Sequence, residues 1–261
     1  MKASRIIEME KYILEKGTAS MEELIQVFGV SANTVRRDIA QLILKGTVDK
    51  VYGGVCSHQK SALLTPYDER RISAEEPKGL IGAAASALVT DGDIIFIDSG
   101  TTTLRMIQGL RDKKNVTIIT NNLDAIVQAV PFENLHVIVL PGSLRRKTNS
   151  FTGGDAVKYL KKYNISKAFM AATGLSVHGA TNSSAQEYEI KQAAVENSEV
   201  VCLLVDSRKF GVTGMLTFAR MDDFDMVVTD QIPSREYSEL LENAGVHLIV
   251  AGKDEKEEIE E

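Results

Sequence analysis

The stretch IIFIDSGTTT, residues 94–103, contains an apolar run, a loop and the start of a helix-like segment in immediate succession. Its four apolar residues, Ile94–Ile97, are typical of a buried strand. The same order recurs along the chain. Further strand-like runs lie at 116–120, 135–140, 168–172, 200–205, 225–229 and 246–250, and most are separated by helix-like segments at 78–89, 103–111, 123–130, 155–163, 185–197 and 234–244. This alternation predicts an α/β domain built on a mainly parallel sheet.

The loop after this first strand is suited to binding an anion. Small residues at the carboxyl end of a strand, leading into a helix, can surround a phosphate with backbone N–H groups and hydroxyls, and the helix dipole favours negative charge there. The alternative is an N-cap and turn without a ligand, which the spacing alone does not exclude. The candidate residues are Asp98, Ser99, Gly100, Thr101, Thr102 and Thr103.

Other polar side chains follow later strands or lie on a helix near them. Asn121 comes directly after the second strand-like run, although asparagine is also common in turns. Lys209 follows the fifth run, where its ammonium group can offer a point charge to a phosphate, unless it is an ordinary surface lysine. Glu187 and Lys191 are spaced for an i,i+4 ion pair. Because ligands of open α/β sheets bind at the carboxyl ends of strands, Asn121 and Lys209 are candidate ligand contacts.

The first 57 residues differ in pattern and in charge. They contain eight Lys or Arg and seven Asp or Glu, a net charge of +1, whereas the whole chain carries −6 and the remainder therefore −7. Helical spacing of apolar residues in 3–16 is followed by a capping box from Ser20 and by Ser31, a suitable N-cap for a third helix. A β-prone run at 47–51 precedes two glycines and suggests a wing hairpin. This order predicts a winged helix-turn-helix.

The third of these helices carries candidate DNA-binding residues. A recognition helix places its first turns against base edges in the major groove, where Asn can pair with adenine and Arg with guanine, while hydroxyls reach bases or phosphates. The alternatives are a solvated helix face with Asp38 as a surface partner of the arginines, or a winged helix that binds protein. The candidates are Ser31, Asn33, Thr34, Arg36, Arg37 and, in the wing, Lys50.

The run Ser31-x-Asn33-Thr34-Val35-Arg36-Arg37-Asp38 resembles the recognition-helix signature of the DeoR family of bacterial transcription regulators. The resemblance extends over nearly the whole chain. It implies that the second domain is related in fold to phosphosugar isomerases and deaminases and that the loop after the first strand binds phosphate. It also implies that Asn121 and Lys209 contact an effector and that Glu187 faces sugar hydroxyls.

The sequence lacks the groups that would make the second domain an enzyme. The stretch 171–176, where the related isomerases carry clustered acidic residues, contains neither a carboxylate nor a histidine to move a proton. No nucleotide-binding fingerprint is present, and the four histidines are too scattered to suggest a metal site. We therefore expect no catalytic residue, no cofactor and no metal. The alternative is a phosphosugar isomerase or deaminase-like enzyme fused to a helix-turn-helix.

Together these features predict a DNA-binding transcriptional regulator that represses a sugar or carbohydrate metabolism operon until a phosphorylated sugar releases it from operator DNA. A DNA-binding domain with few basic residues binds weakly alone, so a homo-oligomer, dimer or tetramer, is expected on a two-part operator. No long apolar run, no signal peptide and only two cysteines indicate a cytoplasmic protein without a membrane partner. The expected domains are a winged helix-turn-helix at 1–56, a linker at 57–77, the α/β effector domain at 78–252 and an acidic tail at 253–261.

Overall fold

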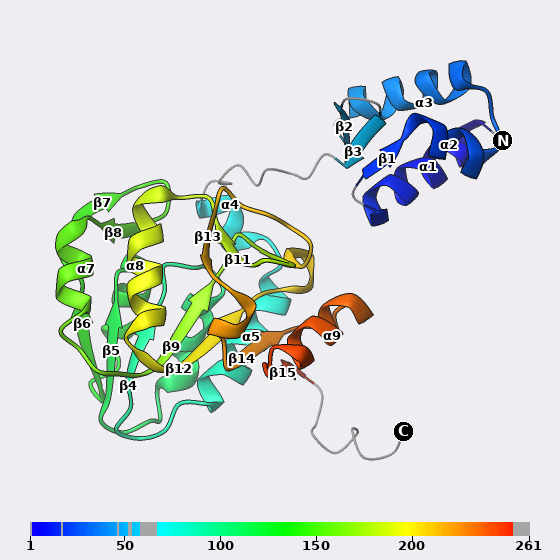
Figure 1. Cartoon of the computed structure of the whole chain (residues 1–261). Coiled ribbons are helices and arrows are strands. Elements are labelled where there is room, and N and C mark those ends of the chain that lie inside the picture. The colour runs from blue at the N-terminus through cyan, green and yellow to red at the C-terminus, as the bar shows by residue number, and fades with distance from the viewer. Residues whose placement is uncertain (1, 17, 46, 52–53, 58–66, 253–261) are drawn as a thin grey trace, which may run out of the picture. The chain divides into compact units, whose positions relative to one another are not determined.

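The structure, a computed structural model, describes residues 2–16, 18–45, 47–51, 54–57 and 67–252 (Figure 1). The chain divides into two compact units, Met1–Ser61 and Ala62–Glu261, which we call the N-terminal and C-terminal units. Each is considered by itself below.

The N-terminal unit consists of three helices and a small antiparallel sheet. Ser20 is the N-cap of the second helix, since its Oγ accepts a hydrogen bond from the backbone N–H of Glu23 at 3.1 Å, and Gly29 ends that helix with φ at 60°. The Glu23 carboxylate bonds to Tyr12 and Lys16, so only the Ser20 half of the expected capping box is seen among the described residues. The helices are α1 (Lys2–Lys16), α2 (Met21–Phe28) and α3 (Ala32–Lys45), and the strands, in the order β1-β3-β2, are β1 (Thr18–Ser20), β2 (Val48–Val51) and β3 (Gly54–Ser57). The three helices and the wing hairpin are confirmed, whereas β1, of three residues, is too short to produce a periodic pattern.

Two ion pairs join α1 to α3 across the core of the N-terminal unit. Arg5 Nε lies 2.8 Å from Asp38 Oδ2, and Lys45 Nζ lies 2.5 Å from Glu10 Oε2. The hydrogen bond from Lys45 holds the pKa of Glu10 below its usual value. Asp38 is completely buried, so the interpretation of this residue as a surface partner of the arginines was wrong. Asp38 pairs instead with Arg5 of α1, because a buried charge requires a partner of opposite charge.

The C-terminal unit is built on a seven-stranded sheet in the order β15-β14-β12-β9-β4-β5-β6, and every neighbouring pair is parallel. Its strands correspond to the seven apolar runs of the sequence, so the predicted mainly parallel α/β architecture is confirmed. They are β4 (Ile94–Ile97), β5 (Val116–Thr120), β6 (Leu135–Val139), β9 (Ile165–Ala171), β12 (Ser198–Leu204), β14 (Met226–Thr229) and β15 (His247–Val250).

Helices cover both faces of this sheet (Figure 1). Along β4, Ile95 and Ile97 belong to one buried cluster and Phe96 to the other, because successive side chains of a strand point to opposite faces. Helices α5 (Glu75–Ala87) and α6 (Leu123–Ala129) and the 3₁₀ helix η1 (Thr103–Leu110) pack in the first cluster, and α7 (Gly154–Leu160), α8 (Ala185–Glu196) and α9 (Arg235–Asn243) in the second. The result is a three-layer sandwich with a core on each side of the sheet.

Several short elements were not expected from the sequence. They include a helix, α4 (Tyr67–Ile72), which lies with the start of α5 inside the range 57–77 that was expected to be a linker. The others are β7 (Ser143–Arg145) with β8 (Ser150–Thr152), the sheet β10 (Gly174–Ser176), β11 (Gly179–Asn182) and β13 (Leu216–Ala219), and the 3₁₀ turns η2 (Ser207–Lys209) and η3 (Met221–Asp223). Elements of three to six residues are too short to show a hydrophobic period.

Within the described ranges, none of the helices combines the length and the apolar character needed to cross a membrane.

Candidate functional sites

One face of α3 is exposed and polar, and the other is buried. Val35, Ile39 and Leu42 pack in the core of the N-terminal unit. Of the predicted DNA-binding residues, Ser31, Asn33, Arg36 and Arg37 are exposed and Thr34 is half-buried. Lys50 lies in β2, but its side chain is outside the described part of the structure.

The start of α3 is fixed by its own hydroxyls. Ser31 Oγ accepts from the backbone N–H of Thr34 at 3.3 Å, and the two hydroxyl oxygens lie 3.0 Å apart. Ser31 is therefore an N-cap as well as a candidate contact. Within the described residues, no hydrogen bond or ion pair engages the side chains of Arg36 and Arg37, so both can meet an external anion or base.

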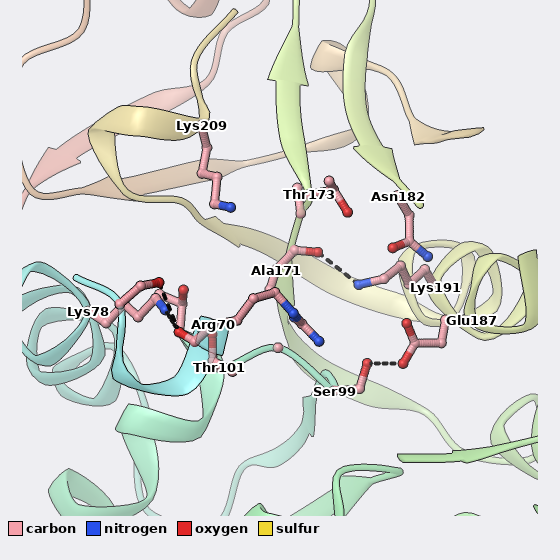
Figure 2. Close-up of a pocket in the computed structure, with 14 residues that line it drawn as sticks. Arg70, Lys78, Ser99, Thr101, Ala171, Thr173, Asn182, Glu187, Lys191 and Lys209 are labelled. Carbon is pink, nitrogen blue, oxygen red and sulfur yellow. Dashed lines mark hydrogen bonds between the residues drawn. The ribbon is translucent and has the colours of Figure 1, made fainter. Parts of the chain in front are cut away.

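A pocket lies at the carboxyl end of the sheet in the C-terminal unit, where the loops after β4, β9 and β12 meet (Figure 2). Helices α4, α5 and α8 and the end of β11 complete its wall. In Figure 2, Lys78 and Lys209 lie on one side, while Asn182, Glu187 and Lys191 lie on the other. The residues that line the pocket are Arg70, Ser73, Lys78, Ser99, Gly100, Thr101, Thr102, Ala171, Ala172, Thr173, Asn182, Glu187, Lys191 and Lys209.

The loop after β4 divides into residues that face the pocket and residues that hold the loop. Ser99, Gly100, Thr101 and Thr102 line the pocket. Thr103 is buried, and its Oγ1 donates to the carbonyl oxygens of Asp98 and Gly100 at 2.8 and 2.9 Å. A Cβ added at Gly100 would lie 2.2 Å from the Cβ of Ala171, so only glycine lets the loop approach β9 this closely.

The predicted contact Asn121 is buried away from the residues that line the pocket. Its Nδ2 donates to the carbonyl of Phe151 at 3.1 Å. Its neighbour Asn122 instead reaches the loop after β4, since its Nδ2 lies 3.3 Å from the carbonyl oxygens of both Asp98 and Gly100. Asn122 also caps α6 through Oδ1. Of the two asparagines at this strand end, Asn122 therefore supports the loop, whereas Asn121 binds β8.

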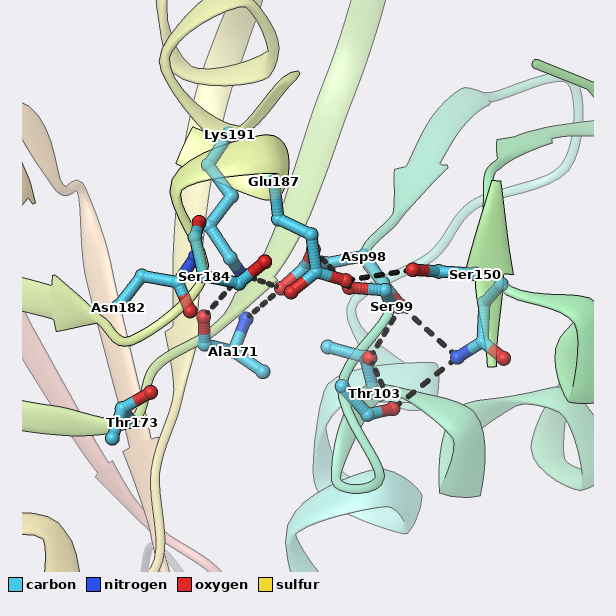
Figure 3. Close-up of polar contacts among 12 residues, drawn as sticks. Asp98, Ser99, Thr103, Ser150, Ala171, Thr173, Asn182, Ser184, Glu187 and Lys191 are labelled. Carbon is cyan, nitrogen blue, oxygen red and sulfur yellow. Dashed lines mark hydrogen bonds and ion pairs between the residues drawn. The ribbon is translucent and has the colours of Figure 1, made fainter. Parts of the chain in front are cut away.

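Two charged side chains of α8 bind the loop through different partners (Figure 3). Glu187 Oε1 accepts hydrogen bonds from Ser99 Oγ at 2.7 Å and from Ser150 Oγ at 2.8 Å. Lys191 forms a buried ion pair with Asp98 and donates to the carbonyl of Ala171 at 2.8 Å. The interpretation of Glu187 and Lys191 as an i,i+4 pair is therefore wrong, because each is satisfied by another element.

Asp98 closes this network from the loop side. One of its carboxylate oxygens accepts from the backbone N–H of Ala171 at 2.9 Å and pairs with Lys191. Both charged groups are almost fully buried, with side-chain exposures of 2% and 4%. Asp98 does not line the pocket, so its contribution is to fix the loop and the end of β9 in one arrangement.

Three basic side chains give the pocket a positive side. Burial lowers the pKa of Lys209 and lowers that of Lys78 to about 8, and it also lowers the pKa of Arg70. These pKa values are lowered because the buried cations have lost hydration. An anionic ligand would compensate for that loss by stabilising the charged forms. Burial would raise the pKa of Asp206, but hydrogen bonding from Arg208 and the nearby Lys209 outweigh it, so this carboxylate keeps its charge beside the lysine.

Arg70, Lys78 and Asn182 are pocket residues that the sequence did not indicate. Arg70 lies in the range expected to be a linker, and its only signal was the charged run 68–71. Lys78 stands at the start of a predicted helix, where nothing marks it as facing a ligand. Asn182 ends a strand of four residues, and its partner in the sheet is Leu216 of β13, a segment distant in sequence.

The side chains that line the described pocket are suited to binding a ligand. Glu187 is the one carboxylate among its lining residues, and hydroxyls of Ser99 and Ser150 both bond to it. The end of β9 contributes the apolar side chains of Ala171 and Ala172 and the hydroxyl of Thr173. Among the described residues, no group of three His, Cys, Asp or Glu side chains could hold a metal ion.

The fold and these two sites define a helix-turn-helix regulator with an α/β sensor domain. Residues 5–61 match the family model of the DeoR-like helix-turn-helix domain, and residues 73–231 match that of the DeoR C terminal sensor domain. The chain belongs to the DeoR family.

Several proteins that match this chain over nearly their whole length are named as transcriptional regulators or repressors. The chain is 48% identical over 251 residues to the HTH-type transcriptional regulator IolR of Bacillus subtilis (strain 168), an alignment that covers 95% of this chain and 100% of IolR. It is 26% identical to the HTH-type transcriptional repressor GlcR of the same organism, with 96% and 97% covered. It is 28% identical to the glycerol-3-phosphate regulon repressor of Escherichia coli (strain K12), with 93% and 95% covered. The chain is therefore a transcriptional regulator and not an enzyme.

Proposed function

We propose that this regulator is a repressor of a carbohydrate operon, that α3 and the wing bind operator DNA, and that a phosphorylated sugar in the C-terminal unit releases it. The observation that carries the proposal is the convergence of Ser99–Thr102, Lys78 and Lys209 on one pocket. Backbone N–H groups and hydroxyls of such a loop, with ammonium groups facing it, are what a phosphate requires. Glu187 lines the opposite side, and we propose that it accepts hydrogen bonds from sugar hydroxyls.

The names of two relatives support a repressor that responds to a phosphorylated metabolite. Two are called repressors, and one of these is named for glycerol 3-phosphate, a small phosphorylated metabolite. For release, the effector must bind the DNA-free form more tightly, and a coupling of about 1–3 kcal/mol between the two sites is typical. We propose that the protein acts as a cytoplasmic homo-oligomer, in which two DNA-binding units engage a two-part operator.

A screen of phosphorylated and unphosphorylated sugars by thermal shift tests the effector class. A phosphorylated sugar at 100 times its Kd is expected to add about 2.7 kcal/mol to the free energy of unfolding of the C-terminal unit. Replacing Lys209 by Ala should weaken that ligand at least about tenfold, because a charge-assisted contact to phosphate is lost. The control is Lys114→Ala, which removes an exposed lysine just before β5, at the opposite end of the sheet. Preferential stabilisation by unphosphorylated sugars, with no effect of Lys209→Ala, would contradict the proposal.

Effector affinity is also expected to depend on pH. The pKa of Lys78 is about 8, lowered from its ordinary value by burial and by Lys209, Arg208 and Arg70, with Asp206 acting in the opposite direction. An anion binds the protonated lysine better, so affinity should be highest below pH 8 and fall as the pH rises through 8. A phosphate monoester stays dianionic over this range, since its second pKa is about 6. Titration calorimetry from pH 7 to pH 9 should show this fall and proton uptake on binding.

The matched variant for the pH experiment is Lys78→Met. It should bind the ligand more weakly at pH 7 and lose most of the pH dependence. An unchanged pH profile in this variant would assign the titration to another group, such as Lys209, whose pKa is also lowered by burial.

A further inference from the structure

Strand β6 is the last strand at one end of the seven-stranded sheet, and β15 is the last at the other end (Figure 1). Within the described ranges β6 pairs with β5 alone, and the register is regular over all five of its residues. A free edge of this kind offers a row of backbone N–H and C=O groups to another strand. Proteins block such pairing with lysine, proline or a bulge, and the β6 sequence LHVIV contains neither of these two residues.

The chain around β6 presents apolar side chains to the surface. Residues 134–144 contain no Asp, Glu, Lys or Arg, and Val139 and Leu144 are exposed within this stretch. On the preceding helix, α6, Val127 and Val130 are also exposed, with 59% and 75% of their surface accessible. We call residues 123–147, which include α6, β6 and the start of the β7–β8 hairpin, the β6 edge. Covering its apolar side chains would contribute about 25 cal/mol for each Å² removed from water.

The two edges of the sheet differ in the helix that precedes the last strand. Before β15, α9 exposes one arginine against three glutamates, Arg235 with Glu236, Glu239 and Glu242. Two copies that met there would bring negative charges together, which opposes association. Before β6, the exposed residues of α6 and its end are valines. The edge at β6 is therefore the one suited to a second copy.

The charges at the two ends of the β6 edge have opposite signs. Glu133 is exposed just before the uncharged stretch, and Arg146 and Lys147 are exposed just after it. When two identical strands pair antiparallel about a two-fold axis, the beginning of one lies beside the end of the other. The acidic end of each copy would then face the basic end of its partner. The β6 edge is thus self-complementary in charge as well as in its backbone groups.

The β6 edge also has the size that a stable interface needs. A dimer interface of standard size takes about 20–30 residues from each partner. Residues 123–147 form a continuous stretch of that length, and the buried residues within it are Ala125, Ala129, Leu135 and Leu140. The remainder of the stretch reaches the surface.

We infer that two copies of the C-terminal unit associate through the β6 edge, with their β6 strands antiparallel about a two-fold axis. The inference rests on the proposed function in one respect, because it assigns the interface of the proposed homo-oligomer. Pairing of this kind continues the sheet from one copy into the other. It satisfies the backbone groups of both free edges and covers the exposed valines of both copies.

Sedimentation velocity of the full-length protein tests the surface. Val127→Lys should halve the mass of the assembly and raise its dissociation constant at least about 100-fold, because the interface would then bury an ammonium group without a partner. Val139→Lys, on the strand itself, should have the same effect. The matched control is Ile232→Lys, since Ile232 is 60% exposed and lies outside the β6 edge, so the mass should not change. All three positions are exposed, and thermal unfolding of each variant checks that the fold is retained.

A disulfide cross-link tests the strand pairing. The register that pairs all five residues places Val137 opposite the same residue of the second copy, with about 4.5–5.5 Å between the Cα atoms, which is within the range of a disulfide. Full-length Val137→Cys should therefore form a covalent dimer on mild oxidation. The controls are the unmodified chain, which has Cys56 and Cys202, and Leu248→Cys at the middle of β15.

The possible results separate this inference from the proposed function. If the Val127→Lys and Val139→Lys variants keep the mass of the unmodified assembly, the inference is overturned and the homo-oligomer stands with another interface. A fall in mass without cross-linking of Val137→Cys beyond the controls would overturn the pairing of the β6 strands. A monomeric unmodified chain would overturn the proposed homo-oligomer and this inference together, whereas the effector screen would still decide the proposed ligand class.

Discussion

Replacing both Arg36 and Arg37 by Ala is expected to weaken strongly the specific binding of this regulator to its target DNA. Both side chains are exposed on α3, opposite the buried Val35 and Ile39, so their removal leaves the core of the N-terminal unit intact. A guanidinium that pairs with guanine contributes about 1–3 kcal/mol, so losing two such contacts should lower affinity by roughly 30-fold to 10⁴-fold. The measurement is a DNA-binding titration at several salt concentrations.

The salt dependence separates the roles of the two arginines. A single substitution that removes a phosphate contact should lower affinity for all sequences and reduce the slope of log K against log salt by about 1. One that removes a base contact should relax the sequence preference at one position. The control is Arg111→Ala, which removes the same charge from an exposed position at the end of η1. Unchanged DNA affinity in the double variant would show that α3 is not the recognition helix.

Replacing Lys191 by Met is expected to destabilise the C-terminal unit more than any surface change. Lys191 and Asp98 are almost fully buried, and the substitution leaves the Asp98 carboxylate without its partner in the interior. Removing one member of a buried ion pair costs about 3–5 kcal/mol, because the remaining charge has lost its hydration and its counter-charge. For a unit of this size, the melting temperature should fall by roughly 6–20 °C in differential scanning calorimetry.

A double substitution identifies the cause of this loss. Asp98→Asn with Lys191→Met removes both charges, and the asparagine oxygen can still accept from the backbone N–H of Ala171, so the double variant should be more stable than Lys191→Met alone. Lys158→Met, which breaks an exposed i,i+3 pair with Asp155, should have no measurable effect. If the double variant lost the sum of the two single effects, the ion pair would not be the source of stability.

The strands were predictable because each leaves a local signal. The run at β4 is continuously apolar, and β5 combines apolar residues with two threonines, since a parallel strand buried on both faces favours apolar and β-branched side chains. The helix-turn-helix was predictable for a similar reason, because a cap at Ser20, a glycine turn at Gly29 and a second cap at Ser31 are all set by neighbouring residues.

The loop after β4 was predictable, but many of the residues that surround it in the pocket were not. Ser99–Thr102 belong to one local motif, and their place at a strand end follows from the order of elements. The partners of Glu187 and Lys191 are instead 88 and 93 residues away in the sequence, so the i,i+4 spacing suggested a pair that the fold does not form. Arg70 was not predicted either, because it reaches the pocket from a helix too short to show a hydrophobic period.

The sequence by itself determined the class of this protein: a DeoR-family regulator with a helix-turn-helix and a sensor domain built on a parallel sheet. These features depend on the spacing of neighbouring residues, which is written directly in the chain. Tertiary structure alone decided which charges face the pocket, that Asp38 and Asp98 are buried partners, and that α4 enters the wall beside the loop. Those properties arise from packing between segments far apart in sequence, and a buried charge selects its partner by proximity in space.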